Sequence, residues 1–314
     1  MDTNIQHWNG RRYYSLDCYL KQRFGEKLYK LSLNGGMTCP NRDGTLSTGG
    51  CIFCSEGGSG EFSAPCTDTE TQIRYAKSLV SRKFTGNRYI AYFQAYTNTY
   101  APAEYLRNLF MPIIQRKDIA VLSIATRPDC LEDDKLALLE ELADIKPVWV
   151  ELGLQTIHEP TAQLINRGYS LPCYDKAVGN LKQIGAQVIT HIILGLPHES
   201  REDMLATADY VGNIGTDGIK IQLLHVLQHT RLAELYQKGE LDVLSESEYV
   251  SLTADIIGIL PENVVIHRLT GDGDRHLLIA PRWSGDKRRV LNQISHQLKT
   301  RNIYQGSLRK RKGE

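Results

Sequence analysis

The chain has 314 residues, 41% hydrophobic and 23% charged, a composition typical of a globular protein with a substantial core. No apolar run reaches the length of a membrane span and the N-terminal residues lack the pattern of a signal peptide, so we expect a cytoplasmic protein with no membrane partner. The seven cysteines, an odd number without a secretory signal, argue against a disulfide framework.

The net charge of +1 hides an uneven distribution along the chain. Residues 281–314 carry +8 and residues 1–30 carry +3, which leaves −10 for residues 31–280. Basic ends on an acidic middle predict contact with a polyanion such as a nucleic acid. A solvated basic tail is the simpler alternative.

The first elements are an N-terminal cap at residues 1–26 and a strand at residues 27–33, where hydrophobicity alternates. The strand leads into a glycine-rich loop at residues 34–62, which we call the cysteine loop. Three of the seven cysteines lie there within sixteen residues, spaced C-x11-C-x2-C: Cys39, Cys51 and Cys54.

Cysteines gather in this way when their thiolates converge on one metal centre. Three thiolates with an open fourth position favour an iron–sulfur cluster whose fourth iron binds a small molecule. Two alternatives stay open at this point: a zinc site that takes a distant fourth ligand, and three unrelated thiols.

A helix at residues 67–84, capped by Thr67 or Asp68, is followed by a regular alternation of strands and helices. Strands are predicted at residues 89–94, 120–125, 147–152, 187–194 and 218–224, and helices at 102–116, 132–145, 159–167, 174–184 and 201–214. Counting the first strand, six strands alternate with helices, which indicates a parallel sheet with right-handed crossovers. The predicted fold is therefore α/β, a partial (βα)6 TIM-like barrel.

The pattern changes at residue 230. Helices at residues 230–238 and 246–258, a strand at 264–269, a loop-like segment at 270–289 and a last helix at 286–300 follow. We therefore divide the chain into the N-terminal cap (residues 1–26), the barrel (27–229) and a C-terminal extension with a basic tail (230–314).

In a parallel sheet, ligands bind at the carboxyl ends of the strands, so polar residues there are candidates for a site. They are Tyr96, Thr97 and Asn98 after the second strand, Arg127 after the third, Glu151 and Gln155 in the fourth, and Gly195 after the fifth. Glu151 lies within an apolar strand, where a carboxylate must be paired or bind something.

The motifs MTCPNRDG, GGCIFCSEGGSG, FQAYTNTYAP, ELGLQT and HIILGLPHE together resemble radical S-adenosylmethionine (SAM) enzymes. The resemblance covers residues 8–301 and is closest to the YhcC/YtqA-like branch, a relative of the elongator catalytic subunit. The long first arm of the cysteine motif departs from the commonest C-x3-C-x2-C pattern of the superfamily, but it is typical of this branch.

The resemblance implies a site with two cofactors, a [4Fe–4S] cluster and SAM. Cys39, Cys51 and Cys54 would ligate the cluster, and its open iron would chelate SAM. Tyr96, Thr97 and Asn98 match the motif that contacts the methionine amino group, and Arg127 would pair with the methionine carboxylate. Polar contacts to ribose would come from Glu151 and Gln155, and Gly195 lies in the stretch that packs near adenine. No catalytic residue is identified.

The resemblance also implies a reaction. One electron from a reduced flavodoxin or ferredoxin would cleave SAM to methionine and a 5′-deoxyadenosyl radical, which abstracts hydrogen from the substrate. Relatives in the branch act on the wobble uridine of tRNA, so the expected substrate is tRNA and the expected change is at its 5-substituent. The elongator catalytic subunit carries an acetyltransferase domain after its radical domain; we expect none in this chain and therefore no acetyl transfer by it. Whether a partner enzyme completes the modification stays open. The alternatives are the same chemistry on a small metabolite or a protein, and a non-catalytic zinc-stabilised RNA-binding module.

The basic C-terminal residues are the predicted RNA contacts. They are Arg282, Lys287, Arg288, Arg289, Arg309, Lys310, Arg311 and Lys312. Trp283, among them, would either stack on a base or pack in the core.

Overall fold

Strands and helices alternate along the computed structural model, which describes residues 8–58, 60, 63–81, 86–271 and 273–309. Seven strands form one sheet in the order β1-β2-β3-β4-β5-β6-β8, and its β1–β2, β2–β3, β3–β4 and β6–β8 pairs are parallel. The strands are β1 (Tyr29–Leu33), β2 (Tyr89–Phe93), β3 (Ile119–Thr126), β4 (Val148–Gln155), β5 (Gln187–Leu194), β6 (Gly218–Leu223) and β8 (Val265–Arg268). This order confirms the predicted class, an α/β fold of the partial TIM-barrel type.

The chain divides into two compact units. Unit 1 contains Met1–Arg23, Leu154–Asn166 and Thr190–Glu314, and unit 2 contains Phe24–Gly153 and Arg167–Ile189. Strands β4 and β5 run through both units. The domains predicted from the sequence are consecutive segments with boundaries at residues 26 and 229, whereas each compact unit combines separated segments. The predicted division stays a prediction.

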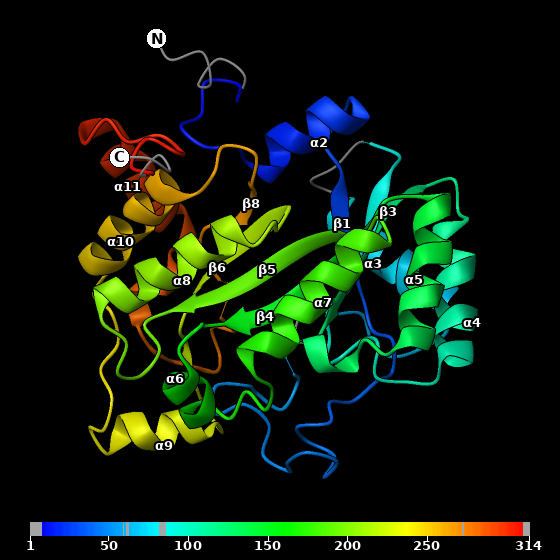
Figure 1. Cartoon of the computed structure of the whole chain (residues 1–314), viewed down its shortest axis with the longest axis horizontal. Coiled ribbons are helices and arrows are strands. Elements are labelled where there is room, and N and C mark those ends of the chain that lie inside the picture. Colours follow the sequence, from blue (N-terminus) through cyan, green and yellow to red (C-terminus); the bar gives the residue numbers. More distant parts are fainter. Residues whose placement is uncertain (1–7, 59, 61–62, 82–85, 272, 310–314) are drawn as a thin grey trace. The chain divides into compact units, whose positions relative to one another are not determined.

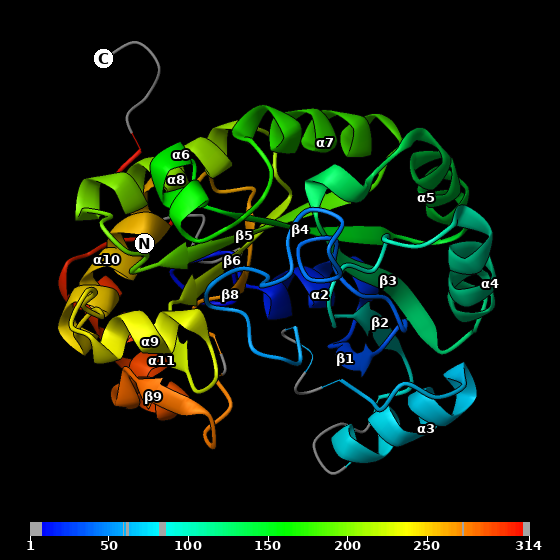
Figure 2. The same ribbon diagram turned by 90° about the horizontal axis from the view of Figure 1, so that it is seen from below.

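In unit 2, helices lie around the outside of strands β1 to β4, and the cysteine loop lies on the inner side (Figure 2). The helices are α3 (Thr69–Val80), α4 (Ala103–Ile114), α5 (Asp133–Ile145) and α7 (Leu171–Gln183), with the short 3-10 helix η1 (Pro128–Cys130). Strand β3 is buried along nearly its whole length, as expected for a parallel strand covered on both faces. The predicted cap of α3 is confirmed at Asp68, whose side chain accepts from the backbone N–H of Thr71 at 3.0 Å. The predicted end of this helix, residue 84, lies outside the described residues.

In unit 1, helices α8, α10 and α11 lie side by side (Figure 1). The elements here are α2 (Leu16–Phe24, ending one residue into unit 2), α6 (Glu159–Leu164), α8 (Arg201–Asn213), α9 (Arg231–Gln237), α10 (Glu246–Ile259), the 3-10 helix η2 (Arg282–Gly285) and α11 (Lys287–Thr300). Helix α11 buries Val290, Ile294 and Leu298, spaced four residues apart, and leaves its other face polar.

Three elements differ from the sequence prediction. Helix α2 forms inside the segment that was predicted only as a cap. The strand predicted in the C-terminal extension is β8, which joins the main sheet beside β6. A short antiparallel pair, β7 (Val226–Leu227) and β9 (Leu278–Ala280), occupies part of the segment predicted as loop. Both strand differences arise from pairing partners that lie far apart in sequence, which local pattern does not reveal.

Candidate active site

Backbone hydrogen bonds hold the cysteine loop both around Cys39 and around Cys51 and Cys54. The carbonyl of Cys39 accepts from the N–H of Arg42 at 2.8 Å, and the carbonyl of Cys51 accepts from the N–H of Cys54 at 3.0 Å. The two arms are joined by the N–H of Gly50, which donates to the carbonyl of Asn41 at 2.7 Å. Residues 39–54 of the loop are therefore folded and are not merely a flexible connection.

The three thiols of the loop are partly exposed, whereas Cys18 and Cys130 are buried. Among the residues that the structure describes, no three His, Cys, Asp or Glu side chains are placed to hold a single metal ion.

Cys51 has a polar environment suited to a metal-binding thiolate. The Nδ2 of Asn41 donates to the Sγ of Cys51 at 3.7 Å. A hydrogen bond with Cys54 lowers the pKa of the Cys51 thiol, burial opposes this, and the positive charge of Arg127 lowers the pKa further. A lowered pKa favours the thiolate, which is the form that binds metals.

The end of β2 is bonded to the cysteine loop. Tyr96, with a left-handed φ of 58°, donates through its hydroxyl to the carbonyl of Glu56 at 2.6 Å and through its N–H to the carbonyl of Gly58 at 3.0 Å. The N–H of Thr97 donates to the carbonyl of Thr38 at 3.2 Å. The structure thus brings Tyr96 and Thr97 against the loop that carries the cysteines.

Asn98 has a different local role. It is fully buried, and its Nδ2 donates to the carbonyls of Phe93, at 3.2 Å, and Ala125, at 2.9 Å. These bonds tie the end of β2 to the end of β3. The buried Oδ1 of Asn98 accepts no hydrogen bond from the described residues.

Arg127 lies near the cysteines but is already engaged. Its guanidinium donates to both carboxylate oxygens of Asp129, at 2.9 and 2.7 Å, and to the carbonyl of Arg167 at 3.0 Å. The same group lies 4.8 Å from the ring centroid of Tyr169. Because Asp129 neutralises its charge, the predicted pairing with a methionine carboxylate would compete with this ion pair, and it stays a prediction.

Glu151 meets the expectation for a buried carboxylate. It is 1% exposed, and its Oε1 accepts from the Nζ of Lys30 and the hydroxyl of Ser123, each at 2.9 Å. The partners come from β1 and β3, which both precede β4 in the strand order, so the carboxylate ties β4 to its neighbour β3 and to the edge strand β1. Its predicted contact with a cofactor is not tested by these bonds.

The remaining predicted cofactor residues, Gln155 and Gly195, belong to unit 1, and their contact with a cofactor stays a prediction. Gln155 ends β4 with a left-handed φ of 68°. Gly195 follows β5 with φ of 85°, and a Cβ there would lie 3.2 Å from the side chain of Leu244. A non-glycine residue held at positive φ is uncommon, and Gln155 and Tyr96 both adopt this conformation.

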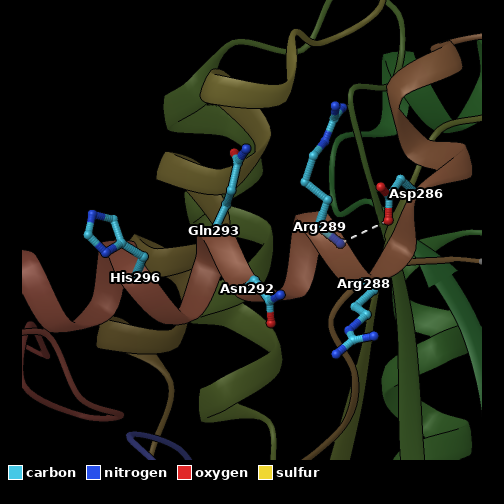
Figure 3. Close-up of a pocket in the computed structure, with 6 residues that line it drawn as sticks. All are labelled: Asp286, Arg288, Arg289, Asn292, Gln293 and His296. Carbon is cyan, nitrogen blue, oxygen red and sulfur yellow. Dashed lines mark hydrogen bonds between the residues drawn. The ribbon is translucent and has the colours of Figure 1, made fainter.

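The predicted RNA contacts also belong to unit 1. Arg288 and Arg289 line a shallow, open pocket of about 460 Å³ along α11, with Asp286, Asn292, Gln293 and His296 (Figure 3). The guanidinium of Arg289 pairs with Glu246 at 2.6 Å, and that of Arg309 donates to Asn213 at 2.6 Å. Arg282 is exposed on η2, and Lys287 opens α11. Lys310, Arg311 and Lys312 lie outside the described residues.

Trp283 is half-buried, and its contacts with Leu244 and Tyr249 are within the protein. Its Nε1 donates to the carbonyl of Leu244 at 3.1 Å, and its ring lies 5.6 Å from that of Tyr249.

Sequence reasoning missed Lys30, the partner of Glu151, and several residues around the cysteines, namely Asn41, Arg42, Arg167 and Tyr169. Asn41 and Arg42 stand inside the quoted motif MTCPNRDG, so their position between the first two cysteines was the available signal. Arg167 and Tyr169 lie far from the cysteines in sequence, and no local pattern marks them.

Comparison with known proteins identifies two matching families. Residues 39–211 match the radical SAM superfamily, and residues 216–300 match the radical SAM C-terminal domain. The chain is 47% identical over 297 residues to YtqA of Bacillus subtilis, covering 94% of this chain and 92% of that protein. It is 36% identical over 289 residues to YhcC of Escherichia coli K12, covering 92% of each.

More distant relatives match only a part of the chain. A protein of Methanocaldococcus infernus described as tRNA uridine(34) acetyltransferase is 28% identical over 158 residues, which cover 48% of this chain and 28% of that protein. The solved structure of Elp3 from the same organism superimposes with a TM-score of 0.67, at 18% identity, over 88% of this chain and 64% of that one. This second likeness shows the fold alone.

The cofactors of the radical SAM superfamily are a [4Fe–4S] cluster and SAM, and together they supply its radical chemistry when bound. The residues of the cysteine loop fit the cluster: three partly exposed thiols, an amide donor on Cys51 and a lowered thiol pKa. In the described part of the chain, no helix is both long and apolar enough to cross a membrane. Family match, relatives and site agree, and the chain belongs to the radical SAM superfamily, in the branch of YtqA and YhcC.

Proposed function

We propose that this radical SAM enzyme modifies tRNA, at the 5-substituent of the wobble uridine. The similarity to a tRNA uridine(34) acetyltransferase supports the choice of substrate, although it covers 48% of this chain. The observation that carries the proposal is the polar face of α11, because an enzyme acting on a polyanion needs a surface that attracts phosphate.

The charge along α11 and the residues after it is positive, although Asp286 lines the same surface and Glu246 pairs with Arg289. From Lys287 to Arg309 the chain contains six Lys or Arg residues and no Asp or Glu. Arg288, Asn292, His296 and Lys299 are exposed along α11. Arg288 and Lys299 form no ion pair with a carboxylate among the described residues, so their charges are available to a partner.

Hydrogen-bond donors lie beside these cations. Figure 3 shows the side chains of Arg289, Gln293 and His296 extending from one side of α11, and those of Arg288 and Asn292 from the neighbouring side. Guanidinium and amide groups both donate to phosphate oxygens, and such contacts position a nucleic acid without reading its sequence. These donors line a shallow, open pocket of about 460 Å³ on α11, together with the carboxylate of Asp286.

A binding experiment tests this surface. We expect Arg288→Glu to weaken tRNA binding and to reduce the salt slope of the binding constant by about one. Arg107→Glu is the matched control, since Arg107 lines a groove of about 520 Å³ between α4 and α5 and already pairs with Glu141 at 2.5 Å. Equal affinity of the Arg288→Glu and wild-type proteins at every salt concentration would remove the proposed surface.

The substrate itself is tested in cells. Mass spectrometry of tRNA nucleosides from cells that lack this gene is expected to reveal a lost or altered wobble uridine, restored by the wild-type gene but not by Cys51→Ala. An unchanged nucleoside profile would remove tRNA as the substrate. The same radical chemistry on a small metabolite or a protein would then be the better proposal.

The proposal includes a cytoplasmic location and a reduced flavodoxin or ferredoxin as the electron donor. A partner enzyme would complete the modification. Each of these is open to direct assay once the altered nucleoside is identified.

A further inference from the structure

Arg42 lies between the first and second cysteines of the cysteine loop and reaches the third. Its Nη2 donates to the carbonyl of Cys54 at 3.0 Å and to the carbonyl of Ser55, and its Nη1 lies 3.5 Å from the carbonyl of Glu56. Its backbone N–H donates to the carbonyl of Cys39 at 2.8 Å. One residue therefore contacts the backbone of two of the three cysteines.

The side chain of Arg42 is seated by its neighbours. A Cβ at Gly50, where φ is 70°, would lie 2.9 Å from the Nε and 3.1 Å from the Cγ of Arg42, so a larger residue would displace the arginine. On another side the guanidinium lies 5.9 Å from the ring centroid of Tyr96. The hydroxyl of Tyr96 donates to the same Glu56 carbonyl that Arg42 approaches. These contacts limit the conformations open to Arg42.

The charge of Arg42 is not neutralised by a carboxylate within the described part of the chain. Its hydrogen-bond acceptors there are carbonyl oxygens of the cysteine loop. The neighbouring Asp43 accepts from the N–H of Thr45 at 3.0 Å instead. Arg127 is different, because Asp129 neutralises it.

We propose that Arg42 is a positioning residue for the iron–sulfur cluster: it fixes the Cys54 arm relative to Cys39 and holds a positive charge that favours the reduced state. Charge-assisted hydrogen bonds are about twice as strong as neutral ones, so the guanidinium is well suited to hold the loop backbone. Reduction adds one negative charge beside it, and cluster potentials respond to nearby charge and hydrogen bonding. This role requires only the iron–sulfur cluster and does not depend on tRNA as the substrate.

Three full-length variants separate the two parts of this role. Arg42→Gln removes the charge and the guanidinium fork, and Arg42→Lys keeps the charge but loses the fork. Arg74→Gln is the control, since Arg74 is exposed on α3 and donates to the hydroxyl of Thr71 at 3.1 Å, away from the loop contacts described above. The measurements are hydrogen–deuterium exchange of residues 50–58 in metal-free protein, and the midpoint potential of the reconstituted cluster, followed by electron paramagnetic resonance (EPR).

We expect Arg42→Gln to speed exchange of residues 50–58 by roughly tenfold or more, and to shift the potential to more negative values. Arg42→Lys should also speed exchange but keep a potential close to that of the wild type, and Arg74→Gln should match the wild type in both. If Arg42→Gln does not hold a cluster, its hydrogen exchange still tests the positioning role, and the potential of Arg42→Lys still tests the charge role. Unchanged exchange in Arg42→Gln overturns the positioning role. An unchanged potential in loaded Arg42→Gln, or a shifted one in Arg42→Lys, overturns the charge role.

Discussion

The buried carboxylate of Glu151 allowed two interpretations at the level of the sequence. Its position inside an apolar strand predicted either a paired carboxylate or a ligand contact, and the structure supplies partners in Lys30 and Ser123. The side chain of Lys30 is 23% exposed while that of Glu151 is fully buried. Loss of the lysine would therefore leave a buried carboxylate without its cation, which costs more than the pair contributes.

Lys30→Met is expected to lower the free energy of unfolding by about 2–4 kcal/mol, because Glu151 stays buried and charged. The double variant Lys30→Met/Glu151→Gln should recover part of this loss, since no buried charge remains. Urea denaturation followed by circular dichroism measures both. A single variant as stable as the wild type would contradict the role assigned to this pair.

The cysteines give a second prediction at this scale. Cys51→Ala should abolish cluster assembly and 5′-deoxyadenosine formation, yet leave the circular dichroism spectrum unchanged, because a partly exposed thiol contributes little to packing. Cys66→Ala is the matched control, as Cys66 is exposed and lies outside the C-x11-C-x2-C motif. Iron analysis after anaerobic reconstitution reports both. Full iron content in Cys51→Ala would refute the ligand assignment.

Among the elements, the cysteine loop depends on its close approach to the end of β2. A Cβ at Gly58, where φ is 55°, would lie 2.3 Å from the ring of Tyr96, so no larger residue fits without moving the ring. At Gly49 a Cβ would meet no atom within 4 Å. Space for a side chain is therefore lacking at Gly58 but present at Gly49.

Gly58→Ala is expected to reduce the iron bound after reconstitution at least several-fold, while Gly49→Ala retains it. The physical reason is displacement of Tyr96, which also bonds the carbonyls of Glu56 and Gly58. Iron and sulfide analysis of the two variants makes the comparison. Equal loading of both would show that the contact with Tyr96 does not hold the loop.

Helix α3 is joined to the start of β3 by charged side chains. Asp118 accepts from Lys77 at 2.5 Å and from Arg116 at 3.0 Å. Burial raises the pKa of Asp118, but the hydrogen bonds from Arg116 and Lys77 outweigh it and lower the pKa to about 2. Because the folded-state pKa is depressed, the contribution to stability is complete above the usual pKa of about 3.9 and is lost as pH falls towards 2.

Asp118→Asn should therefore reduce stability by about 1 kcal/mol at neutral pH, a value discounted for solvent screening, and the difference from wild type should vanish near pH 2. Asp17→Asn, at an exposed ion pair with Lys21 on α2, serves as the control and should change stability less. Thermal unfolding between pH 2 and pH 7 gives the profile. A difference that is constant with pH would contradict the assignment.

For the molecule as a whole, periodicity predicted most of the sheet. The strand at Gln187–Leu194 was placed at its observed bounds, and the fold class followed from the alternation of strands and helices. Helix α2 was missed because its sequence, LDCYLKQRF, has only a weak apolar stripe. The place of β8 could not be predicted, because strand order depends on contacts between distant segments.

For the candidate site, the sequence likewise predicted candidate residues but not the hydrogen bonds between them. Spacing alone marked Cys39, Cys51 and Cys54, and the resemblance added residues at the strand ends. The bonds that hold them were not predictable: Arg42 reaches across twelve residues to Cys54, and Lys30 reaches across the sheet to Glu151. Such contacts are set by tertiary structure, which sequence spacing does not encode.

The position of β8 leads to a prediction about truncation. A chain that ends at residue 229 would lack β8 and leave the edge of β6 without its partner strand. We expect this chain to be insoluble or to unfold without cooperativity, whereas a chain that ends at residue 309 should unfold like the full chain. Soluble expression and calorimetry test both. A stable, cooperative fold for residues 1–229 would instead support a separate C-terminal extension.

The most direct test of the account is EPR spectroscopy of the anaerobically reconstituted, reduced protein, recorded without and with SAM. Three cysteine ligands leave one iron of the cluster free, so we predict a cluster signal whose g-values change when SAM is added, and no signal in Cys51→Ala. A signal that SAM leaves unaltered, or a colourless protein that retains zinc, would contradict it.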